Sequence, residues 1–385
     1  MLRLSDQLWP RKLTVPGNVA SGLPLFIKDV ATLSWDKCDG LVDEVADAAN
    51  QLRWYKLTRP MRSLAAIQEL ANISQEQDVT NVALEQPDID NLCERGMLKE
   101  IEPHTGRKTC HSFTVEESAK GRRRWICHPR WFNDVSDTTD HGVEFPTVEG
   151  VIRRCADFRY AVCLDFAGYF QQFPIEETVG QFFSIRKDGR CWSPTTVPTG
   201  SNTPPLFGQL LASTMAASAT KAFPSVAYDT FIDNIRFCAD NDALLMDVVK
   251  TFYGIAAKMG VTINEKFEEI RPLQQYTFLG ILFDHEKGSV NIGDKTRNKI
   301  KAQIVLIGQA GFDPEHCFGV SVWASIVTGF QLHKAYHVFK YIRRTLNAKK
   351  RDSVEKKIWP SIVPQWTSWL QSLVDSDGRV VRTET

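Results

Sequence analysis

Two short apolar runs with almost nothing between them constrain the fold of this chain most strongly. Ser225 to Ile232 and Ile235 to Cys238 are rich in β-branched and aromatic residues, and Asp233-Asn234 is all that separates them. Two residues can connect antiparallel strands but not parallel ones, which need a long crossover. The sequence therefore predicts a β-hairpin with a polar turn at Asp233-Asn234.

A helix and a buried strand precede this hairpin. Apolar periodicity predicts a helix near Val148 to Ala156, and Tyr160 to Leu164 is a short apolar run of the kind that forms a buried strand. That strand ends on Asp165. A second helix should begin at Pro204-Pro205, because proline is tolerated in a first turn. Its apolar residues are Phe207, Leu210, Leu211 and Met215.

The most regular helical pattern follows the hairpin. It starts after Asn241 and stops at Gly260. Its apolar face comprises Leu244, Leu245, Val248, Val249, Phe252, Ile255 and Met259. Val261 to Ile263 and Tyr276 to Phe283 then have the composition of strands. The order of elements from 148 to 283 predicts an α+β fold, with a sheet covered by helices on one face.

The regions outside this pattern are less regular. Alternating apolar and polar residues in Ser112 to Glu116 and Trp125 to His128 predict a hairpin with the basic Lys120 to Arg124 at its tip. Residues 1–95 contain an acidic helical pattern from Cys38 to Leu52 but no recognisable chemistry. The last hundred residues are mainly helical and basic, with apolar periodicity from Val320 to Leu346.

Composition limits the class of protein. A chain of 385 residues can form two or three packed subdomains, and none of its apolar stretches is long enough to span a membrane. The formal net charge of zero argues against a protein that simply coats nucleic acid. Its basic clusters are then either solvated faces or local phosphate contacts. They lie at Lys120 to Arg124, Lys295 to Lys301 and Arg343 to Arg351.

Cysteine usage indicates a reducing intracellular compartment, either cytoplasm or nucleus. Nine cysteines form no CxxC pair and are odd in number, which argues against a zinc ribbon and against a disulfide framework. The start, Met1 to Ser5, is compatible with a short organellar presequence, but Asp6 and Trp9 follow and no secretory apolar core appears.

Two acidic residues occupy positions at which a charge is costly. Asp165 ends an apolar strand and Asp233 lies in the tight turn of an apolar hairpin, so each needs a partner. Paired carboxylates at adjacent strand ends suit two divalent cations, Mg²⁺ or Mn²⁺, which activate an attacking hydroxyl and stabilise a leaving phosphate oxygen. The alternative for either residue alone is the cap of a loop or turn.

Five sequence blocks occur in one order around these residues, and together they resemble the fingers and palm of reverse transcriptases over about residues 96–285. The blocks are Phe113-Thr-Val with Lys120-Gly-Arg-Arg-Arg-Trp-Ile-Cys-His-Pro-Arg130-Trp-Phe-Asn133, Asp165-Phe-Ala-Gly-Tyr-Phe170-Gln-Gln-Phe-Pro-Ile175, Val197-Pro-Thr-Gly-Ser-Asn-Thr-Pro-Pro-Leu-Phe207, Phe231-Ile-Asp-Asn234 and Phe278-Leu-Gly-Ile-Leu-Phe283. The helical pattern from Ser325 to Phe330 and from Arg343 to Leu346 is in addition similar to the enzymes of DIRS-like and VIPER-like retroelements and to pararetrovirus-like enzymes.

The resemblance implies a metal site. Asp165 and Asp233 would be metal ligands, together with the main-chain carbonyl of Phe166 and the side chain at position 234. The main departure from the family is Asn234, where a second aspartate is usual, so the site loses one negative charge. An amide oxygen can still bind a hard cation. Asp229 cannot easily replace the missing carboxylate, because four strand residues span about 13 Å.

The resemblance also implies a nucleotide site. Phe170 would be the aromatic gate that crowds a ribose 2′-hydroxyl and favours deoxynucleotides; the alternative is an ordinary core aromatic. Lys120 and Arg124 match the cations that grip triphosphate oxygens. Thr199 and Gly200 match the turn beneath the nucleotide, although this block is one residue shorter than is usual and has threonine in place of glutamine.

Further residues would contact the primer and the duplex. Lys266 corresponds to the lysine pair from which the pyrophosphate proton donor is drawn, although its neighbour is Phe267. Phe278, Leu279 and Gly280 resemble the primer-grip turn. The basic C-terminal region would track duplex phosphates. The residues expected to do so are Lys295, Arg297, Lys299, Arg343 and Arg344.

Two other features favour plainer interpretations. His333 and His337 have the spacing of metal ligands on a helix, but no third ligand is evident, so surface or core histidines are expected. Asp375 to Gly378 has the look of the start of an RNase H domain, but few residues follow, so no complete nuclease is expected in this chain.

The resemblance implies a right-hand polymerase with a palm sheet backed by helices: an N-terminal extension at 1–95, fingers and palm at 96–285, and a helical thumb or connection at 286–385. Its expected function is RNA-directed DNA synthesis for a retrotransposon, with an RNA template, a DNA primer and dNTPs as partners and no membrane. The alternative is an inactive, domesticated protein of the same fold that binds nucleic acid or acts as a scaffold. An RNA-dependent RNA polymerase is disfavoured by Phe170.

Overall fold

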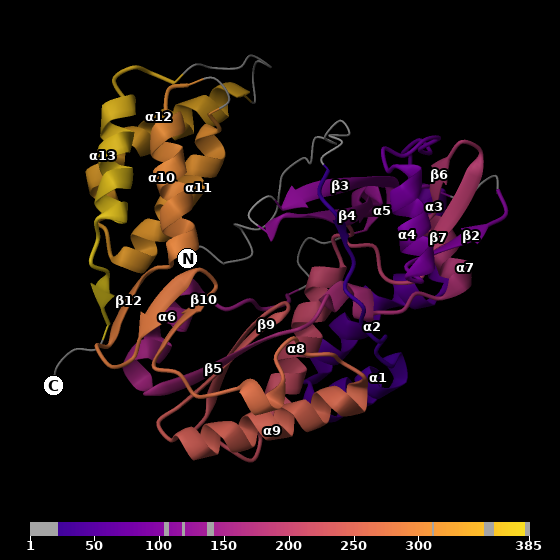
Figure 1. Ribbon diagram of the computed structural model, residues 1–385, viewed down its shortest axis with the longest axis horizontal. Coiled ribbons are helices and arrows are strands. Elements are labelled where there is room, and N and C mark those ends of the chain that lie inside the picture. The colour runs from indigo at the N-terminus through magenta and orange to yellow at the C-terminus, as the bar shows by residue number, and fades with distance from the viewer. Residues whose placement is uncertain are drawn as a thin grey trace.

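A three-stranded antiparallel sheet lies at the centre of the chain (Figure 1). The computed structural model describes residues 22–103, 108–117, 120–136, 142–309, 312–349 and 358–381. The sheet has the order β5 (Tyr160–Asp165), β9 (Asn234–Ala239), β8 (Ala227–Phe231). The predicted hairpin and the strand that ends on Asp165 are therefore both present, in one sheet.

The hairpin turn lies one residue earlier than predicted. Asn234 is the first residue of β9 and pairs with both Phe231 and Asp165, so the two turn residues are Ile232 and Asp233. Ile232 has a φ of +58°, which is rare for a β-branched residue. A positive φ at the first central residue alone is the pattern of a type II′ turn.

Alternate residues of the central sheet project into two different hydrophobic cores. Val162, Leu164 and Phe237 belong to the larger core, under helices α8 (Pro204–Thr220) and α9 (Asp242–Met259). Ala161 and Cys238 belong to the smaller core on the opposite face, with helix α6 (Val148–Asp157) and the C-terminal region. The prediction of helices on one face was therefore incomplete, because the second face is also covered.

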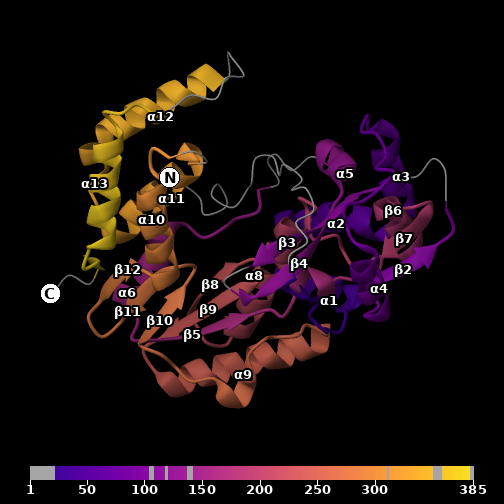
Figure 2. The ribbon, with the colours of Figure 1, turned by 45° about the horizontal axis from the view of Figure 1, so that its top comes forward.

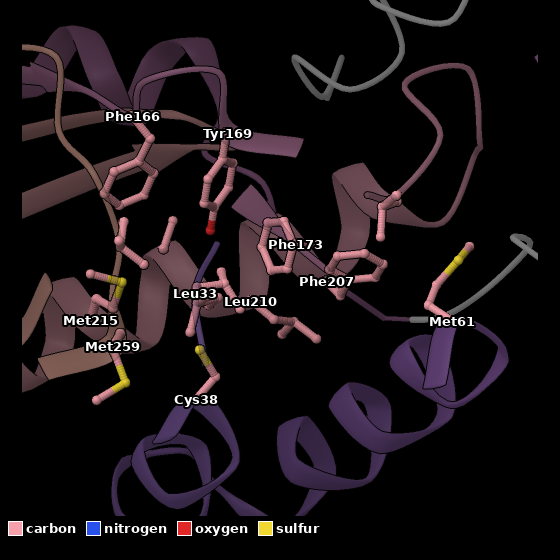
Figure 3. Close-up of a cluster of buried hydrophobic side chains, with 14 of the residues drawn as sticks. Leu33, Cys38, Met61, Phe166, Tyr169, Phe173, Phe207, Leu210, Met215 and Met259 are labelled. Carbon is pink, nitrogen blue, oxygen red and sulfur yellow. The ribbon is translucent and has the colours of Figure 1, made fainter. Parts of the chain in front are cut away.

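The larger core continues into the N-terminal part of the chain. Helices α1 (Trp35–Val45) and α2 (Ala48–Arg62) pack on α8. Figure 3 shows Leu33 and Cys38 beside Tyr169, Phe173 and Phe207, aromatic rings that contact one another at centroid distances of 5.0–5.1 Å. The core is thus continuous across residue 95, while the predicted domain boundary there stays a prediction.

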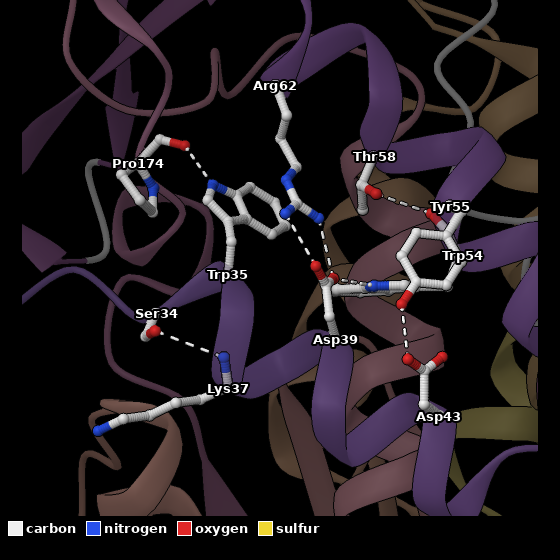
Figure 4. Close-up of polar contacts among 10 residues, drawn as sticks. All are labelled: Ser34, Trp35, Lys37, Asp39, Asp43, Trp54, Tyr55, Thr58, Arg62 and Pro174. Atoms are coloured by element: carbon white, nitrogen blue, oxygen red, sulfur yellow. Dashed lines mark hydrogen bonds and ion pairs between the residues drawn. The ribbon is translucent and has the colours of Figure 1, made fainter.

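The acidic pattern from Cys38 to Leu52 forms two helices rather than one. The chain leaves α1 at Ala46, and the Asp47 carboxylate caps α2 by accepting a hydrogen bond from the Asn50 N–H at 2.8 Å. The two helices are joined by the ion pair of Asp39 with Arg62 at 2.8 Å (Figure 4). The Trp54 indole N–H donates to the same carboxylate.

The remaining N-terminal elements form a lobe that extends to one side of the central sheet (Figure 1). It contains helices α3 (Leu64–Ile73), α4 (Gln86–Glu94), α5 (Arg130–Val135) and α7 (Glu177–Gly180), with two three-stranded sheets. One sheet has the order β2 (Leu98–Ile101), β7 (Arg190–Pro194), β6 (Ile185–Lys187), and the other has the order β1 (Leu25–Phe26), β4 (Arg122–His128), β3 (His111–Glu117).

The basic hairpin forms as predicted, but most of its arginines do not lie at the tip. Arg122, Arg123 and Arg124 belong to β4, and Lys120-Gly121 is the described part of the tip. Arg123 pairs with Asp88 of α4 at 2.6 Å, and Arg122 pairs with Glu117 at 2.5 Å. Both are thereby engaged within the lobe.

The C-terminal region lies on the other side of the sheet (Figures 1 and 2). Strands β10 (Gln275–Phe278), β11 (Ile281–Asp284), β12 (Ser289–Ile292) and β13 (Arg379–Val380) form an antiparallel sheet. Helices α10 (Asp294–Leu306), α11 (Pro314–Thr328), α12 (Tyr336–Lys349) and α13 (Val363–Val374) rise from it. Val261 to Ile263, predicted as a strand, makes just an isolated bridge between Ile263 and Phe166.

The described residues can be compared with the expectations about membrane spans and about cysteine pairing. In the described ranges, no helix is both long enough and apolar enough to cross a membrane. All nine cysteines lie in these ranges, and each is a free thiol in the structure. The possible presequence at Met1 to Ser5 falls outside the described residues.

Candidate active site

Asp165 and Asp233 meet at one end of the central sheet. Asp165 is the last residue of β5 and is the strand partner of Asn234, which directly follows Asp233. The Phe166 N–H donates to the Asp233 carbonyl oxygen at 2.9 Å. Backbone pairing therefore fixes the two predicted metal ligands next to each other.

The strained turn that carries Asp233 is held from the α8 side. The Ile232 N–H donates to Gln209 Oε1 at 2.7 Å, and Gln209 Nε2 donates back to the Thr230 carbonyl at 3.1 Å. Gln209 is a buried residue in the middle of α8, and our sequence reasoning missed its role. The available signal was one polar amide within an otherwise apolar helical run, and buried polar groups require partners.

The carboxyl groups lie in an environment that opposes their charges. Burial raises the pKa of Asp165 to about 6, and the charges of Asp233 and Glu265 add to the rise, against a hydrogen bond from Asn264 and the charge of Lys28. Burial also raises the pKa of Asp233, against hydrogen bonds from its own backbone and from Asn234 and the charge of Arg124. The acid pair is incompletely neutralised by the protein, as expected of a site for cations.

Asn234 uses its amide group within the site. Its Nδ2 donates to Asp233 Oδ1 at 2.9 Å, so the amide oxygen is the atom left to face a cation. Asp229 is engaged elsewhere, because its carboxylate pairs with Arg236 at 2.6 Å. A further acid, Glu265, lies beside Asp165 and accepts a hydrogen bond from the Asp165 N–H at 3.0 Å. The described chain contains no cluster of three or more His, Cys, Asp or Glu residues suited to a metal ion.

This set of donors fits magnesium better than zinc. Two carboxylates, an amide oxygen and main-chain oxygens are hard ligands, and they are too few to form a closed protein cage. Mg²⁺ binds to one or two carboxylates and takes its other ligands from water and substrate phosphates. The residues at hand would thus hold Mg²⁺ or Mn²⁺ when a phosphate ligand is present.

The predicted triphosphate cations lie on the hairpin opposite the acids. Arg124 is about half exposed, 3.9 Å from Glu117, and near enough for its charge to lower the pKa of Asp233. Lys120 is exposed at the tip. The structure therefore brings Arg124 and the acid pair together, and it adds Lys28, which sequence reasoning missed because its segment is far away in sequence.

The two phenylalanines of the site differ in exposure. Phe166 is buried in the larger core, so its main chain rather than its side chain is available to a ligand. Phe170 is half-buried in the 3₁₀ turn Tyr169–Gln172, and its ring lies against Tyr169 at a centroid distance of 6.0 Å. A part of the Phe170 ring thus remains at the surface, as a gate requires.

The turn predicted to lie beneath the nucleotide is fixed to the strand that carries Arg124. The Gly200 N–H donates to the Cys127 carbonyl of β4 at 2.8 Å, and the Gly200 carbonyl accepts from Asn133 Nδ2 at 2.9 Å. Thr199 Oγ1 lies 3.4 Å from the Cys127 nitrogen. Thr199 and Gly200 therefore link the hairpin to the start of α8.

Replacing Gly200 by alanine should lower the free energy of unfolding by about 1–3 kcal/mol. A Cβ there would lie 2.6 Å from the Cys127 carbonyl oxygen and 2.8 Å from His128 Cα, and these backbone atoms cannot rotate away. Urea denaturation measures the change. Gly254→Ala in α9 is the matched control, because nothing lies within 4 Å of its added Cβ. Equal losses in both variants would contradict the close approach.

Other predicted residues lie outside this cluster or have structural partners. Lys266 is 77% exposed and pairs with Glu269 at 3.6 Å, and none of its described contacts reaches Asp165 or Asp233. Leu279 and Gly280 form a two-residue turn with φ of +51° and +80°, and Phe278 before them is buried in the smaller core. The predicted bend at Gly280 is confirmed.

The expected phosphate contacts of the C-terminal helices fall into two groups. Lys295, Lys299 and Arg343 are exposed on α10 and α12, and Arg344 is exposed beside Trp359, whose ring centre is 5.6 Å from its guanidinium. Arg297 is half-buried and donates to the Val374 carbonyl at the end of α13. Arg297 thus holds two helices together. His333 and His337 are exposed, as the plainer interpretation expected.

Below the acid pair, a buried ionic network joins the central sheet to the C-terminal region. Arg236 is fully buried and donates to Asp229 Oδ2 at 2.6 Å, to the Val151 carbonyl at 2.7 Å and to Tyr276 Oη at 3.1 Å. The Tyr276 hydroxyl in turn lies 2.8 Å from His285 Nε2. This network ties β9 to α6 and β10.

Comparison with solved structures identifies the fold. The chain is similar to the foamy viral protease-reverse transcriptase dRH in complex with double-stranded DNA, with a TM-score of 0.58 and 14% identity over 92% of this chain and 62% of that one. It is similar to the foamy viral protease-reverse transcriptase with an RNA/DNA hybrid (TM-score 0.54, 13% identity, 93% of this chain and 48% of that one). The same enzyme with double-stranded DNA gives a TM-score of 0.54 at 14% identity, over 94% and 75%.

These likenesses show a reverse-transcriptase-like fold of mixed helices and sheets. The chain spans about 62% of the length of the first of these proteins. No family model matches the sequence, and no curated protein matches it either.

Proposed function

We propose that this chain is the polymerase core of a retroelement reverse transcriptase, which adds deoxynucleotides to a primer 3′-hydroxyl on an RNA template. The observation that carries the proposal is the pair of half-buried acids at one end of the central sheet, near Arg124 of the β3–β4 hairpin, within a reverse-transcriptase-like fold. The C-terminal helices would act as a thumb, and the proposed source is a DIRS-like, VIPER-like or pararetrovirus-like element.

The residues of the site divide the work of nucleotidyl transfer. Asp165, Asp233, the Asn234 amide oxygen and the Phe166 carbonyl would hold two Mg²⁺ ions, which when bound polarise the phosphate and the primer hydroxyl. Arg124 and Lys120 would bind triphosphate oxygens and orient the α-phosphate for in-line attack. The hydrogen bond that Gln209 Oε1 accepts from the Ile232 N–H would keep the Asp233 turn in place, so that little reorganisation accompanies the reaction.

The exposed part of the Phe170 ring should set sugar selectivity. Phe170→Val would leave room for a 2′-hydroxyl, so discrimination against ribonucleotides in single-nucleotide insertion should fall by about tenfold or more. Phe223→Val is the control, because Phe223 is also half-buried against the larger core but at the far end of α8. If Phe170→Val discriminates against ribonucleotides as strongly as the unmodified chain does, Phe170 is not the gate.

Primer extension tests the proposal as a whole. The full chain would be given an RNA template, a DNA primer and dNTPs, with Mg²⁺ and separately with Mn²⁺, and compared with Asn234→Asp. Extension by the unmodified chain would establish that asparagine is a tolerated ligand. Primer extension by Asn234→Asp but not by the unmodified chain would show that the fold is intact and that asparagine at position 234 abolishes activity. If neither protein extends the primer but both bind nucleic acid, the scaffold alternative is favoured.

A further inference from the structure

We infer that residues 25–34 form a strap across the nucleotide site and that Lys28 binds the triphosphate of the incoming nucleotide. The inference rests on the proposed function and gives the N-terminal segment, for which the sequence suggested no chemistry, a part in it. Its first support is the way in which the structure holds the strap at both ends.

One end of the strap is paired with the cationic hairpin. Strand β1 runs parallel to β4, with Leu25 opposite Arg123 and Phe26 opposite Arg124. The Arg122 guanidinium lies 3.7 Å from the centre of the Phe26 ring. The strap therefore starts directly beside the residue predicted to grip triphosphate oxygens.

The other end of the strap is fixed beneath the acid pair. The Leu33 N–H donates to the Gln172 carbonyl at 2.7 Å, and the Ser34 N–H donates to the Met259 carbonyl at 2.9 Å. Gln172 belongs to the 3₁₀ turn that also carries Phe170. Lys28 is thus placed between two anchored ends, on the path from the hairpin to the β5 end.

The contacts of Lys28 place its side chain at the acid pair. A Cβ added to Gly168, three residues after Asp165, would lie 3.2 Å from Lys28 Cβ and 3.4 Å from its Cγ. The Lys28 ammonium donates to Asn264 Oδ1, and Asn264 Nδ2 donates to Asp165 Oδ2. Glycine at position 168 leaves the space in which the lysine stem lies.

The ammonium of Lys28 has hydrogen-bonding capacity for a ligand. An ammonium has three donors, and within the described part of the chain its partner is a neutral amide oxygen rather than a carboxylate at ion-pair distance. Its side chain is half-buried, and its contact with Asn264 lies at the surface, where a ligand can approach the ammonium. A triphosphate held by Arg124 on one side and by cations at Asp165 on the other would have anionic oxygens within reach of this group.

Nucleotide binding without chemistry tests the inference. The full chain would be loaded with an RNA template and a dideoxy-terminated DNA primer, and the dissociation constant of dTTP opposite adenine would be measured with Mg²⁺. Lys28→Met should raise this constant by about tenfold or more, because a charge-assisted hydrogen bond is lost. Lys28→Arg should stay within about threefold of the unmodified chain. The weak binding of dTMP should be the same for all of them.

Two further variants complete the test. Lys37→Met is the matched control, because Lys37 is an exposed lysine of α1 whose side chain points away from its neighbours (Figure 4). Asn264→Ala separates direct contact from an effect relayed to Asp165: it should weaken dTTP binding much less than Lys28→Met does. An equal loss in Asn264→Ala, without rescue by Lys28→Arg, would overturn the direct contact.

The remaining outcomes separate this inference from the proposed function. If the unmodified chain binds template-primer but no dTTP, the polymerase proposal fails and the role of Lys28 fails with it. If the unmodified chain binds dTTP and Lys28→Met binds it equally well, the proposed function stands and the inference alone is overturned.

Discussion

Primer extension should fall by at least about a thousandfold when Asp233 is replaced by alanine, since cation-assisted stabilisation of the transition state supplies several kcal/mol and 4 kcal/mol corresponds to about 10³ in rate. With asparagine already at position 234, no second carboxylate directly follows Asp233, and Asp229 is held by Arg236. The other acid near the site, Glu265, lies on the Asp165 side, where its Oε2 accepts from the Asp165 N–H at 3.0 Å. The measurement is single-nucleotide extension on an RNA template under single-turnover conditions.

The same variant should keep its fold. Asp233 is an acid whose pKa burial raises, so its charge is unfavourable in the folded protein and its removal should not lower the melting temperature. Asp240→Ala is the matched control, because Asp240 is an exposed aspartate just beyond the other end of β9. Extension that survives in Asp233→Ala, or that falls equally in Asp240→Ala, would contradict the assignment of Asp233 as a ligand.

Replacing Arg236 by methionine should lower the free energy of unfolding by about 3–5 kcal/mol, the usual result of leaving a buried charge without its partner. Arg236 is fully buried, and its guanidinium satisfies Asp229, the Val151 carbonyl and the Tyr276 hydroxyl together. Removing it leaves the buried Asp229 carboxylate with Arg154, at 3.7 Å, as its remaining ion-pair partner among the described residues. Urea denaturation followed by circular dichroism measures the loss.

An exposed ion pair in the same protein provides the comparison. Arg190 pairs with Glu100 at 2.7 Å, but both side chains are about half exposed, so solvent screens the pair and Arg190→Met should lower stability far less than Arg236→Met. Adding Asp229→Asn to Arg236→Met should recover part of the loss, because the stranded charge is then absent. Equal losses for the two arginine variants, or no recovery in the double variant, would show that the buried pair contributes little.

Local patterns were sufficient to predict the elements on which the site is built. The apolar runs on either side of Asp233 formed their hairpin, and α9 began and ended at its polar cap Asn241 and at Gly260, which has a φ of +76°. These features depend on neighbours in sequence, so a single chain reveals them. The strand order that brings Asp165 beside Asn234 was not predicted, because it depends on pairing between segments about 70 residues apart.

The details that were missed depend on distant contacts. The turn moved to Ile232-Asp233 because Gln209, more than twenty residues earlier, accepts the Ile232 N–H and stabilises a backbone conformation that isoleucine alone would avoid. Lys28 was missed for the same reason, since its partner Asn264 is 236 residues away. No local pattern encodes either contact.

One missed element did carry a local signal. Strands β6 and β7 are joined by Asp188-Gly189, both with positive φ, and an Asp-Gly pair between short apolar-containing runs is a strong hairpin signal. The sequence was sufficient to predict where Asp165 and Asp233 lie on their strand and turn. It could not predict the raised pKa of Asp165, because that pKa depends on burial by segments that are distant in sequence.

The central sheet has a consequence for recombination between related genes. Residues of β5, β8 and β9 and of helix α6 form part of the smaller core, together with the helices that follow residue 286. A chimera joined near residue 285 would seat its new C-terminal helices on a surface shaped for the old ones, because α6 and the inward-facing residues of the sheet stay with the N-terminal part. Chimeras should fold when the exchanged segment also carries α6 and the residues of the central sheet that face the smaller core. The segment that must be exchanged together is therefore longer than the C-terminal helices alone.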